Sequence, residues 1–475
     1  MEKEYSEKSG EYQYDLLILG GGPGGYVAAI RAGQLGMKVA VVEKEAIGGT
    51  CLHHGCIPSK AIIRNAEVLS LIRESEKFGI KVDNVQADFG AAIDRSQEVL
   101  GKLHKGVTHL MEKRGVEIHA GFGKLTGPNT LEVKGEKETK TLRGKSIIIS
   151  TGSRVRSLPH LKIDGKRILT SDEALLRKAL PKSVLIVGGG AIGCEFAYIY
   201  AAYGLPVTIV ETLPNLLPLE DSEVSKLLER SFKKRKITVL TNTSVAAVKD
   251  EKGMFKIEVK TADGESETRE AEVILVAVGR APNVEGIGLE TLDVSLDEKT
   301  KLIQVDEKMQ TNKPNIFAIG DVSSRPALAH GAMAQGVFVV ESLAGIARTP
   351  IELLNVPSAV YCHPQVASVG LTEEKAKAAG HSVKVAKFPL SANGKALALG
   401  ETEGFVKIVT DEKYGEILGA HIIGAEATEL IGEFVLAQTL ESTAAELKQS
   451  IHPHPTLSEA VMEAGGALFG EAIHS

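Results

Sequence analysis

The sequence predicts an α/β protein with two βαβ-based domains, one inserted in the other, and a C-terminal α+β domain. The first observation is an internal repeat: residues 15–43 and 184–211 each read as an apolar strand, a glycine turn, a helix and a second strand ending in glutamate. The second is that each repeat is followed by hairpin-like strands and then by an apolar strand running into glycine. The third is a change near residue 350, where short alternating strands are followed by amphipathic helices.

The elements between and after the repeats follow in chain order. A long helical stretch is predicted over 59–114, and hairpin strands are predicted near 129–133 and 137–142. A second pair of hairpin strands is expected near 245–249 and 255–260. Strands that run into glycine are expected at 146–150, 273–278 and 316–319, and those of the C-terminal part at 366–369, 405–409 and 417–423, with helices from Thr428 onward. The predicted domains are therefore 1–156, 157–280, 281–350 (completing the first domain) and 351–475.

Composition and charge exclude several classes of protein. Of 475 residues, 43% are apolar and 24% are charged, which is ordinary for a soluble globular chain and excludes global disorder. The 55 basic and 61 acidic residues give a net charge of −6, so we expect no nucleic-acid partner. No apolar stretch approaches the roughly 18–20 residues of a membrane span, and no targeting segment is evident. Four cysteines indicate a reducing compartment, and we expect a cytoplasmic protein.

Both glycine turns are typical of dinucleotide binding. The first has G-x-G-x-x-G spacing and is followed by an acid 23 residues after its first glycine; the second repeats both features. Glycines let the backbone approach a pyrophosphate, and the helix N-terminus supplies N–H groups that bind it. The carboxylate accepts hydrogen bonds from the ribose hydroxyls. The sequence thus predicts two Rossmann-like dinucleotide-binding domains, and the alternatives are a plain tight turn or a degenerate copy kept for packing. The residues concerned are Gly20, Gly22, Gly25 and Glu43, and Gly188, Gly190, Gly193 and Glu211.

Two such sites favour electron transfer between a tightly held flavin and an exchangeable nicotinamide. Glu211 would repel a 2′-phosphate, which favours NAD over NADP.

The segment GGTCLHHGCIPSK, residues 48–60, carries two of the cysteines. Cys51 and Cys56 follow the strand that ends in Glu43, so we expect them near the first nucleotide. A cysteine at a helix N-terminus has a lowered pKa, and such a pair could pass electrons to a flavin as a redox disulfide. Two alternatives stay open: a zinc site that includes His53 and His54, or two structural thiols.

Other polar residues carry weaker signals. Lys60 and Glu195 each read as solvated charges when taken alone, and Cys194 and Cys362 as inert buried thiols. In the tail motif HPHPTLSEA, residues 452–460, His454 is a candidate general base whose tautomer Glu459 would fix, with Thr456 as a helix cap. The alternative interpretations of the tail are a surface capping segment or metal binding by the two histidines.

Together these motifs resemble the flavin disulfide reductases and, within them, the dihydrolipoamide dehydrogenase branch. The resemblance rests on GGGPGG, GGTCLHHGCIPSK, GGGAIGCE, AVGRAPN, IFAIGDV and HPHPTLSE, which together cover nearly the whole chain. It implies FAD-dependent oxidation of protein-bound dihydrolipoamide with reduction of NAD+. It also implies a homodimer served by lipoyl-bearing subunits of a 2-oxoacid dehydrogenase or glycine-cleavage system, with no metal. The departure from the family pattern is His53-His54, where Asn followed by an apolar residue is common.

The resemblance also assigns roles to individual residues. Cys51 would exchange with substrate, Cys56 would lie against the flavin, Lys60 paired with Glu195 would tune it, and His454 with Glu459 would act as acid/base from the other subunit. FAD would be bound by Gly20, Gly22, Gly25, Glu43, Thr50, Lys60, Gly123, Asp321 and Ala329. NAD would be bound by Gly188, Gly190, Ile192, Gly193, Glu211, Val245, Ala277, Gly279 and Arg280.

Two other functions remain possible from the sequence. One is an NADH-dependent reductase of another small disulfide, or an NADH oxidase. The other is a flavin-binding scaffold without turnover. Glu211 argues against the NADP-linked glutathione reductases, and the absence of a cysteine pair from residues 465–475 argues against mercuric and thioredoxin reductase types.

Overall fold

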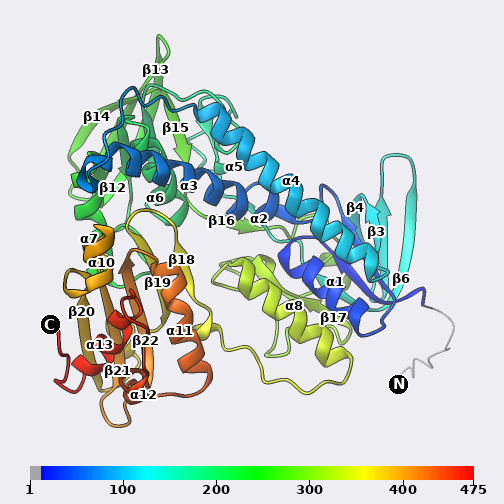
Figure 1. The fold of residues 1–475 in the computed structure, drawn as a ribbon. Helices are drawn as coiled ribbons and strands as arrows, with labels where there is room; N and C mark the ends of the chain where they lie inside the picture. Colours follow the sequence, from blue (N-terminus) through cyan, green and yellow to red (C-terminus); the bar gives the residue numbers. More distant parts are fainter. Residues whose placement is uncertain (1–11, 475) are drawn as a thin grey trace. The chain divides into compact units, whose positions relative to one another are not determined.

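The computed structural model describes residues 12–474 (Figure 1). The chain forms two compact units, each built from several segments. Unit 1 holds the chain up to Pro58, Arg95–Val155 and Arg280–Leu353; unit 2 holds Ser59–Asp94, Arg156–Gly279 and the chain from Leu354 onward. The chain leaves unit 1 twice and returns to it at Arg95 and at Arg280; the second departure corresponds to the predicted insertion, whereas residues 59–94 were expected in the first domain. The residue boundaries of the predicted domains stay predictions.

Unit 1 is organised around a parallel sheet. β3 (Glu117–Ala120), β2 (Val39–Glu43), β1 (Tyr14–Leu19) and β6 (Thr139–Ile149) are neighbours in that order, and β17 (Ile316–Ala318) pairs with β6. The apolar residues of β1 alternate between two buried clusters, because helices α1 (Pro23–Gln34) and α8 (Ala329–Leu343) contribute to one cluster and the hairpin strands to the other. A parallel strand that is buried on both faces reads as a continuous apolar run, as this one does.

Unit 1 matches the predicted hairpin but differs from the prediction on either side of it. β5 (Thr130–Lys134) pairs antiparallel with the first part of β6, as predicted for 129–133 and 137–142. However, β6 continues without a break into the next predicted strand, 146–150, and β4 (Phe122–Gly127), which also pairs with β5, was not predicted. Gly144 reads as a break, yet a Cβ there would lie 2.7 Å from Leu17 Cγ. The glycine therefore permits a close approach to β1 rather than a turn.

The predicted long helix over 59–114 is wrong in one respect, because it is interrupted. The segment contains α3 (Cys56–Arg73), a short 3₁₀ turn (Ser75–Phe78) and α4 (Phe89–Lys113), with irregular chain between. Gly79, with φ of +75°, ends the first part, since a left-handed glycine stops a helix. A separate short helix, α2 (Gly49–His53), precedes α3.

The second sequence repeat lies in unit 2 and also forms a parallel sheet. β11 (Ile237–Leu240), β10 (Val207–Val210), β9 (Val184–Val187), β15 (Val273–Val276) and β8 (Ile168–Leu169) are neighbours in that order. Helix α6 (Ala191–Ala202) follows β9, and α7 (Ser222–Lys234) follows β10. The predicted hairpin is β12 (Thr243–Glu251) and β13 (Met254–Thr261), joined by β14 (Ser266–Ala271), which the sequence did not indicate because its residues are charged and mostly exposed.

The C-terminal part of unit 2 is the predicted α+β domain. Its antiparallel sheet has the order β18 (Ser358–Val360), β19 (Gln365–Gly370), β22 (Ile417–Gly424), β21 (Phe405–Asp411) and β20 (Val383–Pro389). Helices α11 (Ala427–Thr439), α12 (Ala444–Gln449) and α13 (Glu459–Ala467) pack with one face of this sheet in a shared apolar cluster. No helix within residues 12–474 combines the length and apolarity that crossing a membrane requires.

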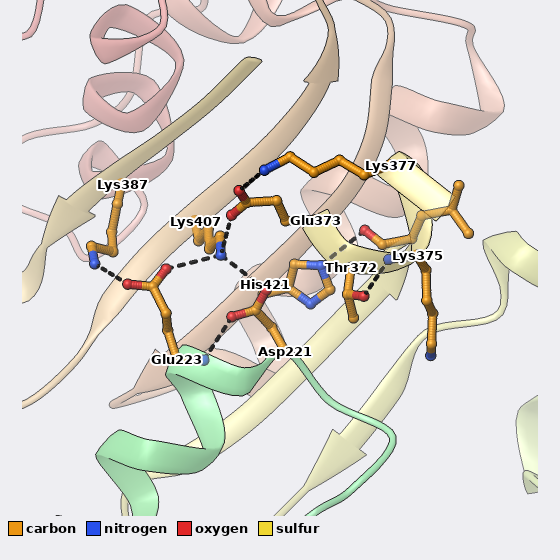
Figure 2. A network of polar contacts seen from close by, with 10 residues as sticks. Asp221, Glu223, Thr372, Glu373, Lys375, Lys377, Lys387, Lys407 and His421 are labelled. Carbon is orange, nitrogen blue, oxygen red and sulfur yellow. Dashed lines mark hydrogen bonds and ion pairs between the residues drawn. The ribbon is translucent and has the colours of Figure 1, made fainter. Parts of the chain in front are cut away.

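The opposite face of that sheet contains a buried cation. Lys407 of β21 is only 2% exposed, and its Nζ lies 2.9 Å from Asp221, 2.9 Å from Glu223 and 3.0 Å from Glu373 (Figure 2). Asp221 also caps α7 by accepting from the backbone N–H of Glu223. His421 of β22 is the cross-strand partner of Lys407. The network therefore joins the parallel-sheet part of unit 2 to its C-terminal sheet.

We expect Lys407→Met to destabilise the fold by about 3–5 kcal/mol, because it leaves the 3%-exposed Asp221 carboxylate without its cation. Denaturant unfolding measures this effect. The matched control is Lys377→Met: Lys377 is 59% exposed and pairs with Glu373, so its loss should change stability by about 0–1 kcal/mol. Equal effects of the two substitutions would contradict a central role for the buried lysine.

The same network makes stability sensitive to acid. Burial alone would raise the pKa of Glu223, but hydrogen bonds from Lys387 and Lys407 outweigh it and lower this pKa to about 2. A hydrogen bond from Lys377, and then one from Lys407, lowers the pKa of Glu373. A carboxylate with a lowered pKa in the folded state stabilises the fold above its ordinary pKa of about 4.3, and this contribution is lost as pH falls toward 2. The unfolding temperature should therefore fall more steeply below pH 4.3 in the wild type than in Lys407→Met, and parallel curves would contradict the account.

Candidate active site

The first glycine turn has the geometry of a pyrophosphate cradle. Gly20 has φ of +107°, and a Cβ on Gly25 would lie 1.9 Å from Gly20 O, so neither position accepts a side chain. Glu43 Oε2 accepts from Gly21 N at 2.7 Å, which fixes the acid beside the turn. Gly22 is the N-cap of α1 without a side-chain cap, and the nearest atom to a Cβ there is 4.0 Å away. The start of α1 is thus open to an anion.

The second turn repeats this geometry in unit 2. Gly188 has φ of +109°, a Cβ on Gly193 would lie 2.0 Å from Gly188 O, and Glu211 Oε2 accepts from Gly189 N at 2.6 Å. Gly190 caps α6 without a side chain, and a Cβ there would meet nothing within 4 Å. Each unit therefore offers a cradle that a dinucleotide fits.

The cysteine segment is anchored on the first turn. Gly48 N donates to Gly21 O at 2.8 Å, and a Cβ on Gly49 would lie 2.7 Å from Gly22 Cα. Cys51 lies in α2, directly after this contact, and is half-buried. The cysteine-bearing helix is thereby fixed against the cradle, as the sequence predicted.

A glycine lets the chain before Cys56 approach the backbone that carries Cys51. A Cβ on Gly55 would lie 3.0 Å from Thr50 O and 3.5 Å from Cys51 Cα, so the chain before Cys56 packs on the backbone that carries Cys51. Cys56 is half-buried and is the first residue of α3. A thiol at a helix N-terminus is favoured as the thiolate.

The neighbouring histidine is engaged with the backbone. Ile47 O lies 2.9 Å from His53 Nε2 and 3.0 Å from His104 Nδ1, so two rings share one carbonyl acceptor. Within residues 12–474, no group of three or more His, Cys, Asp or Glu side chains is arranged to hold a metal ion. His104 was missed from the sequence, because a lone histidine on an amphipathic helix carries no signal of its partner.

The predicted contact between Lys60 and Glu195 is confirmed. Lys60 Nζ lies 2.9 and 3.0 Å from the two carboxylate oxygens of Glu195, which is 5% exposed. Tyr361, which sequence reasoning missed, donates its backbone N–H to Glu195 at 3.1 Å and places its ring 4.5 Å from Lys60 Nζ. Lys60 lies four residues after Cys56 on α3, so both side chains project from the same helix face. The flavin-tuning role of the pair stays a prediction.

Asp321, Arg280 and Thr50 are linked through a serine that the sequence did not indicate. Ser153 Oγ donates to Asp321 Oδ2 at 2.5 Å and accepts from Arg280 Nε at 2.7 Å, while Ser153 O accepts from the same guanidinium at 2.7 Å. Arg280 Nη2 lies 3.5 Å from Thr50 Oγ1. The sequence analysis assigned Arg280 to NAD. In the structure Arg280 lies in unit 1, next to Thr50 and Asp321, which were assigned to FAD. Ser153 follows a turn glycine, where serine is common for local reasons, so no signal could have identified it.

The tail dyad is formed as predicted. His454 Nδ1 lies 2.9 Å from Glu459 Oε1, and Glu459 Oε2 accepts from Thr456 N at 2.8 Å. That backbone hydrogen bond, followed by the contact with His454, lowers the pKa of Glu459. The His454 side chain is 80% exposed, so its other nitrogen is accessible. The predicted helix cap at Thr456 is wrong: α13 begins at Glu459 after Ser458, and Thr456 Oγ1 donates to Pro453 O instead.

The remaining predicted contacts are placed as follows. Gly123 packs so closely on Leu19 that a Cβ would lie 2.3 Å from Leu19 Cδ1. Close packing alone therefore explains why a glycine occupies this position. The other residues assigned to a cofactor lie as follows: Ala329 at the start of α8, Ile192 in the first turn of α6, Val245 in β12, and Ala277 beside Gly188. Gly279 has φ of +95°. The cofactor roles of all these residues, Gly123 included, stay predictions.

The other two cysteines are buried, as predicted. Cys194 Sγ donates to Gly189 O and Cys362 Sγ to Pro364 O, both at 3.3 Å. Burial raises the pKa of both thiols, which keeps them protonated.

The geometry agrees with comparisons against known proteins. Residues 14–336 match the family described as pyridine nucleotide-disulphide oxidoreductase, and residues 356–465 match its dimerisation domain. A Bacillus subtilis protein named dihydrolipoyl dehydrogenase is 48% identical over 97% of this chain and 99% of its own. A Zymomonas mobilis protein of the same name is 47% identical at the same coverage.

Two solved structures have the same fold. LpdA from Mycobacterium tuberculosis has a TM-score of 0.88 and 28% identity, covering 95% of this chain and 99% of its own. The HOCl-induced flavoprotein disulfide reductase RclA from Escherichia coli has a TM-score of 0.85 and 26% identity, again covering 95% and 99%. The α/β architecture predicted from the sequence is confirmed.

Proposed function

Because the chain belongs to the pyridine nucleotide-disulphide oxidoreductase family, we propose that it is a dihydrolipoyl dehydrogenase, which oxidises protein-bound dihydrolipoamide and reduces NAD+ to NADH. The observation that carries the proposal is the packing of the Cys51 segment on the first glycine turn, through Gly48 and Gly49. This contact ties a cysteine pair to a dinucleotide cradle. The name shared by relatives that are 48% and 47% identical along nearly the whole chain supports the choice of substrate.

Each unit supplies residues for one dinucleotide. In unit 1, Gly22 and the start of α1 would face the pyrophosphate of FAD, Glu43 its ribose, and Asp321 another hydroxyl group of the cofactor. In unit 2, Gly190 and Glu211 would hold NAD in the same way, and the 8%-exposed Glu211 carboxylate disfavours the 2′-phosphate of NADP. FAD held by these residues would supply a two-electron carrier between the dithiol pair and the nicotinamide.

The chain's own residues carry out the thiol chemistry. His454 takes a proton from one thiol of dihydrolipoamide, and its Nδ1–H is held by Glu459, which leaves Nε2 as the base. The substrate thiolate attacks Cys51 Sγ, the Cys51–Cys56 bond breaks, and a mixed disulfide forms with Cys56 as the leaving thiolate. The second substrate thiol then attacks the mixed disulfide, its proton passes to the departing Cys51 thiolate, and lipoamide leaves with its new S–S bond. Cys51 is left as the thiol, Cys56 as the thiolate and His454 with the first proton.

The assembly follows from the same proposal. The match to a dimerisation domain over residues 356–465 supports a homodimer, and we assign His454 to the active site of the partner subunit. The substrate would be carried by lipoyl-bearing subunits of a 2-oxoacid dehydrogenase or glycine-cleavage system in the cytoplasm.

The test uses the purified, FAD-loaded protein. We expect rapid reduction of NAD+ by dihydrolipoamide and at most weak reduction of NADP+. The second candidate is an NADH-dependent reductase of another small disulfide, or an NADH oxidase. Slow lipoamide turnover together with fast consumption of oxygen or of another disulfide would favour it and would contradict the proposed substrate.

A further inference from the structure

The tail contains a second histidine–carboxylate pair that the proposed chemistry does not use. His452 lies two residues before His454, and its side chain is only 7% exposed, whereas that of His454 is 80% exposed. His452 Nε2 lies 2.8 Å from Glu433 Oε1 of α11, and His452 Nδ1 lies 3.0 Å from Ser450 O. The buried ring thus connects the tail segment to a helix and to the segment's own backbone.

Two oxygen atoms hold this ring. One ring nitrogen of His452 faces a carboxylate oxygen and the other faces a backbone carbonyl oxygen, so both ends of the ring are held. The contact with Glu433 and the contact with the Ser450 carbonyl together limit rotation of the ring.

Two further contacts hold the rest of the segment. Ser450 Oγ donates to Glu446 O at 2.8 Å at the end of α12, and Asn393 Nδ2 donates to Thr456 O at 3.0 Å. Between these ends, the His452 side chain is buried, whereas Ile451 is 98% exposed and the His454 side chain 80% exposed. Glu459 orients the ring of His454, and the buried His452 anchors the backbone two residues before it.

We propose that His452 and Glu433 are positioning residues for the acid/base histidine: their contact fixes the segment 450–456 so that His454 meets the substrate thiol. This inference rests on the proposed function of His454. It differs from the role of Glu459, which contacts His454 directly and sets its tautomer.

The test compares two reactions of each purified, FAD-loaded variant. One is reduction of NAD+ by dihydrolipoamide, which needs His454. The other is oxidation of NADH by ferricyanide, which takes electrons without thiol–disulfide exchange. His452→Ala and Glu433→Ala should lower kcat for dihydrolipoamide by about 10²-fold, the loss that follows when a reacting group is misplaced by about 1 Å, and leave the ferricyanide reaction unchanged. Glu433→Gln, which keeps the acceptor oxygen, should restore part of the lost kcat.

The chain offers a matched control. His474 Nδ1 lies 2.6 Å from Glu463 Oε1, so this is also a histidine–glutamate pair in unit 2, and it holds the C-terminal tail instead of the His454 segment. His474→Ala and Glu463→Ala should leave the ratio of the two reactions at its wild-type value. A loss in both reactions for His452→Ala would indicate a general structural role and overturn the proposal.

A double substitution separates this inference from the proposed function. If His452 acts through His454, adding His452→Ala to His454→Gln should lower dihydrolipoamide turnover no further, because the two residues work as a unit. Multiplicative losses, or full activity of His452→Ala in an enzyme whose wild type turns over dihydrolipoamide, would refute the inference alone. A wild type without dihydrolipoamide turnover would instead refute the proposed function.

Discussion

Replacing either Cys51 or Cys56 with serine should abolish reduction of NAD+ by dihydrolipoamide. A serine hydroxyl cannot form the S–S bond that the substrate thiolate must attack, so no exchange pathway remains. We expect a loss on the order of 10⁶-fold, the size measured in other enzymes when a catalytic nucleophile is removed. Steady-state assays of the FAD-loaded variants measure it. Either variant retaining wild-type turnover would exclude the Cys51–Cys56 pair as the redox centre.

The other two cysteines serve as controls for this experiment. Cys194→Ser and Cys362→Ser place a hydroxyl next to the carbonyl oxygens of Gly189 and Pro364, which can accept its hydrogen bond. Their turnover should stay near that of the wild type. The two active-site variants should also differ from each other, since Cys51→Ser keeps the Cys56 thiol at the start of α3 and Cys56→Ser does not. A long-wavelength thiolate–flavin absorbance is therefore expected at rest in Cys51→Ser alone.

The second large effect is expected at His454. Substitution with glutamine keeps a polar side chain of similar size but removes the base, so kcat for dihydrolipoamide should fall by about 10²–10⁴-fold. Oxidation of NADH by ferricyanide should be unchanged, because that reaction involves no substrate thiol. An unchanged kcat for dihydrolipoamide would assign proton transfer to another group. Glu459→Gln should have a smaller effect, since its amide oxygen can still accept from His454 Nδ1.

The parts of the fold that were predicted correctly are those with a strong local pattern. The two βαβ units were identified because a parallel strand buried on both faces is a continuous apolar run, and because the glycine turns repeat with the same spacing to Glu43 and Glu211. β14 was missed because its residues are charged, and β6 was divided because Gly144 reads as a break where it allows close packing. In both cases tertiary contacts decide the structure.

For the site, too, residues in local motifs were predicted and contacts between distant segments were not. Cys51, Cys56, His454 and Glu459 lie in short motifs whose spacing implies chemistry. The structure joins His454 to Glu459 directly and packs the backbone before Cys56 on that of Cys51. The supporting contacts are distant in sequence: Ser153 meets Asp321 across 168 positions and Tyr361 meets Glu195 across 166. No local pattern encodes such a pairing, since it depends on how the chain returns to each unit.

The most direct measurement is an anaerobic stopped-flow experiment in which the oxidised, FAD-loaded protein is mixed first with dihydrolipoamide and then with NAD+. If Cys51 exchanges with the substrate and Cys56 faces the flavin, a long-wavelength thiolate–flavin band should appear in the first mixing and decay as NADH forms in the second. Cys56→Ser should show no such band. Flavin absorbance unaffected by dihydrolipoamide, or a band that appears without Cys56, would contradict electron transfer through this cysteine pair.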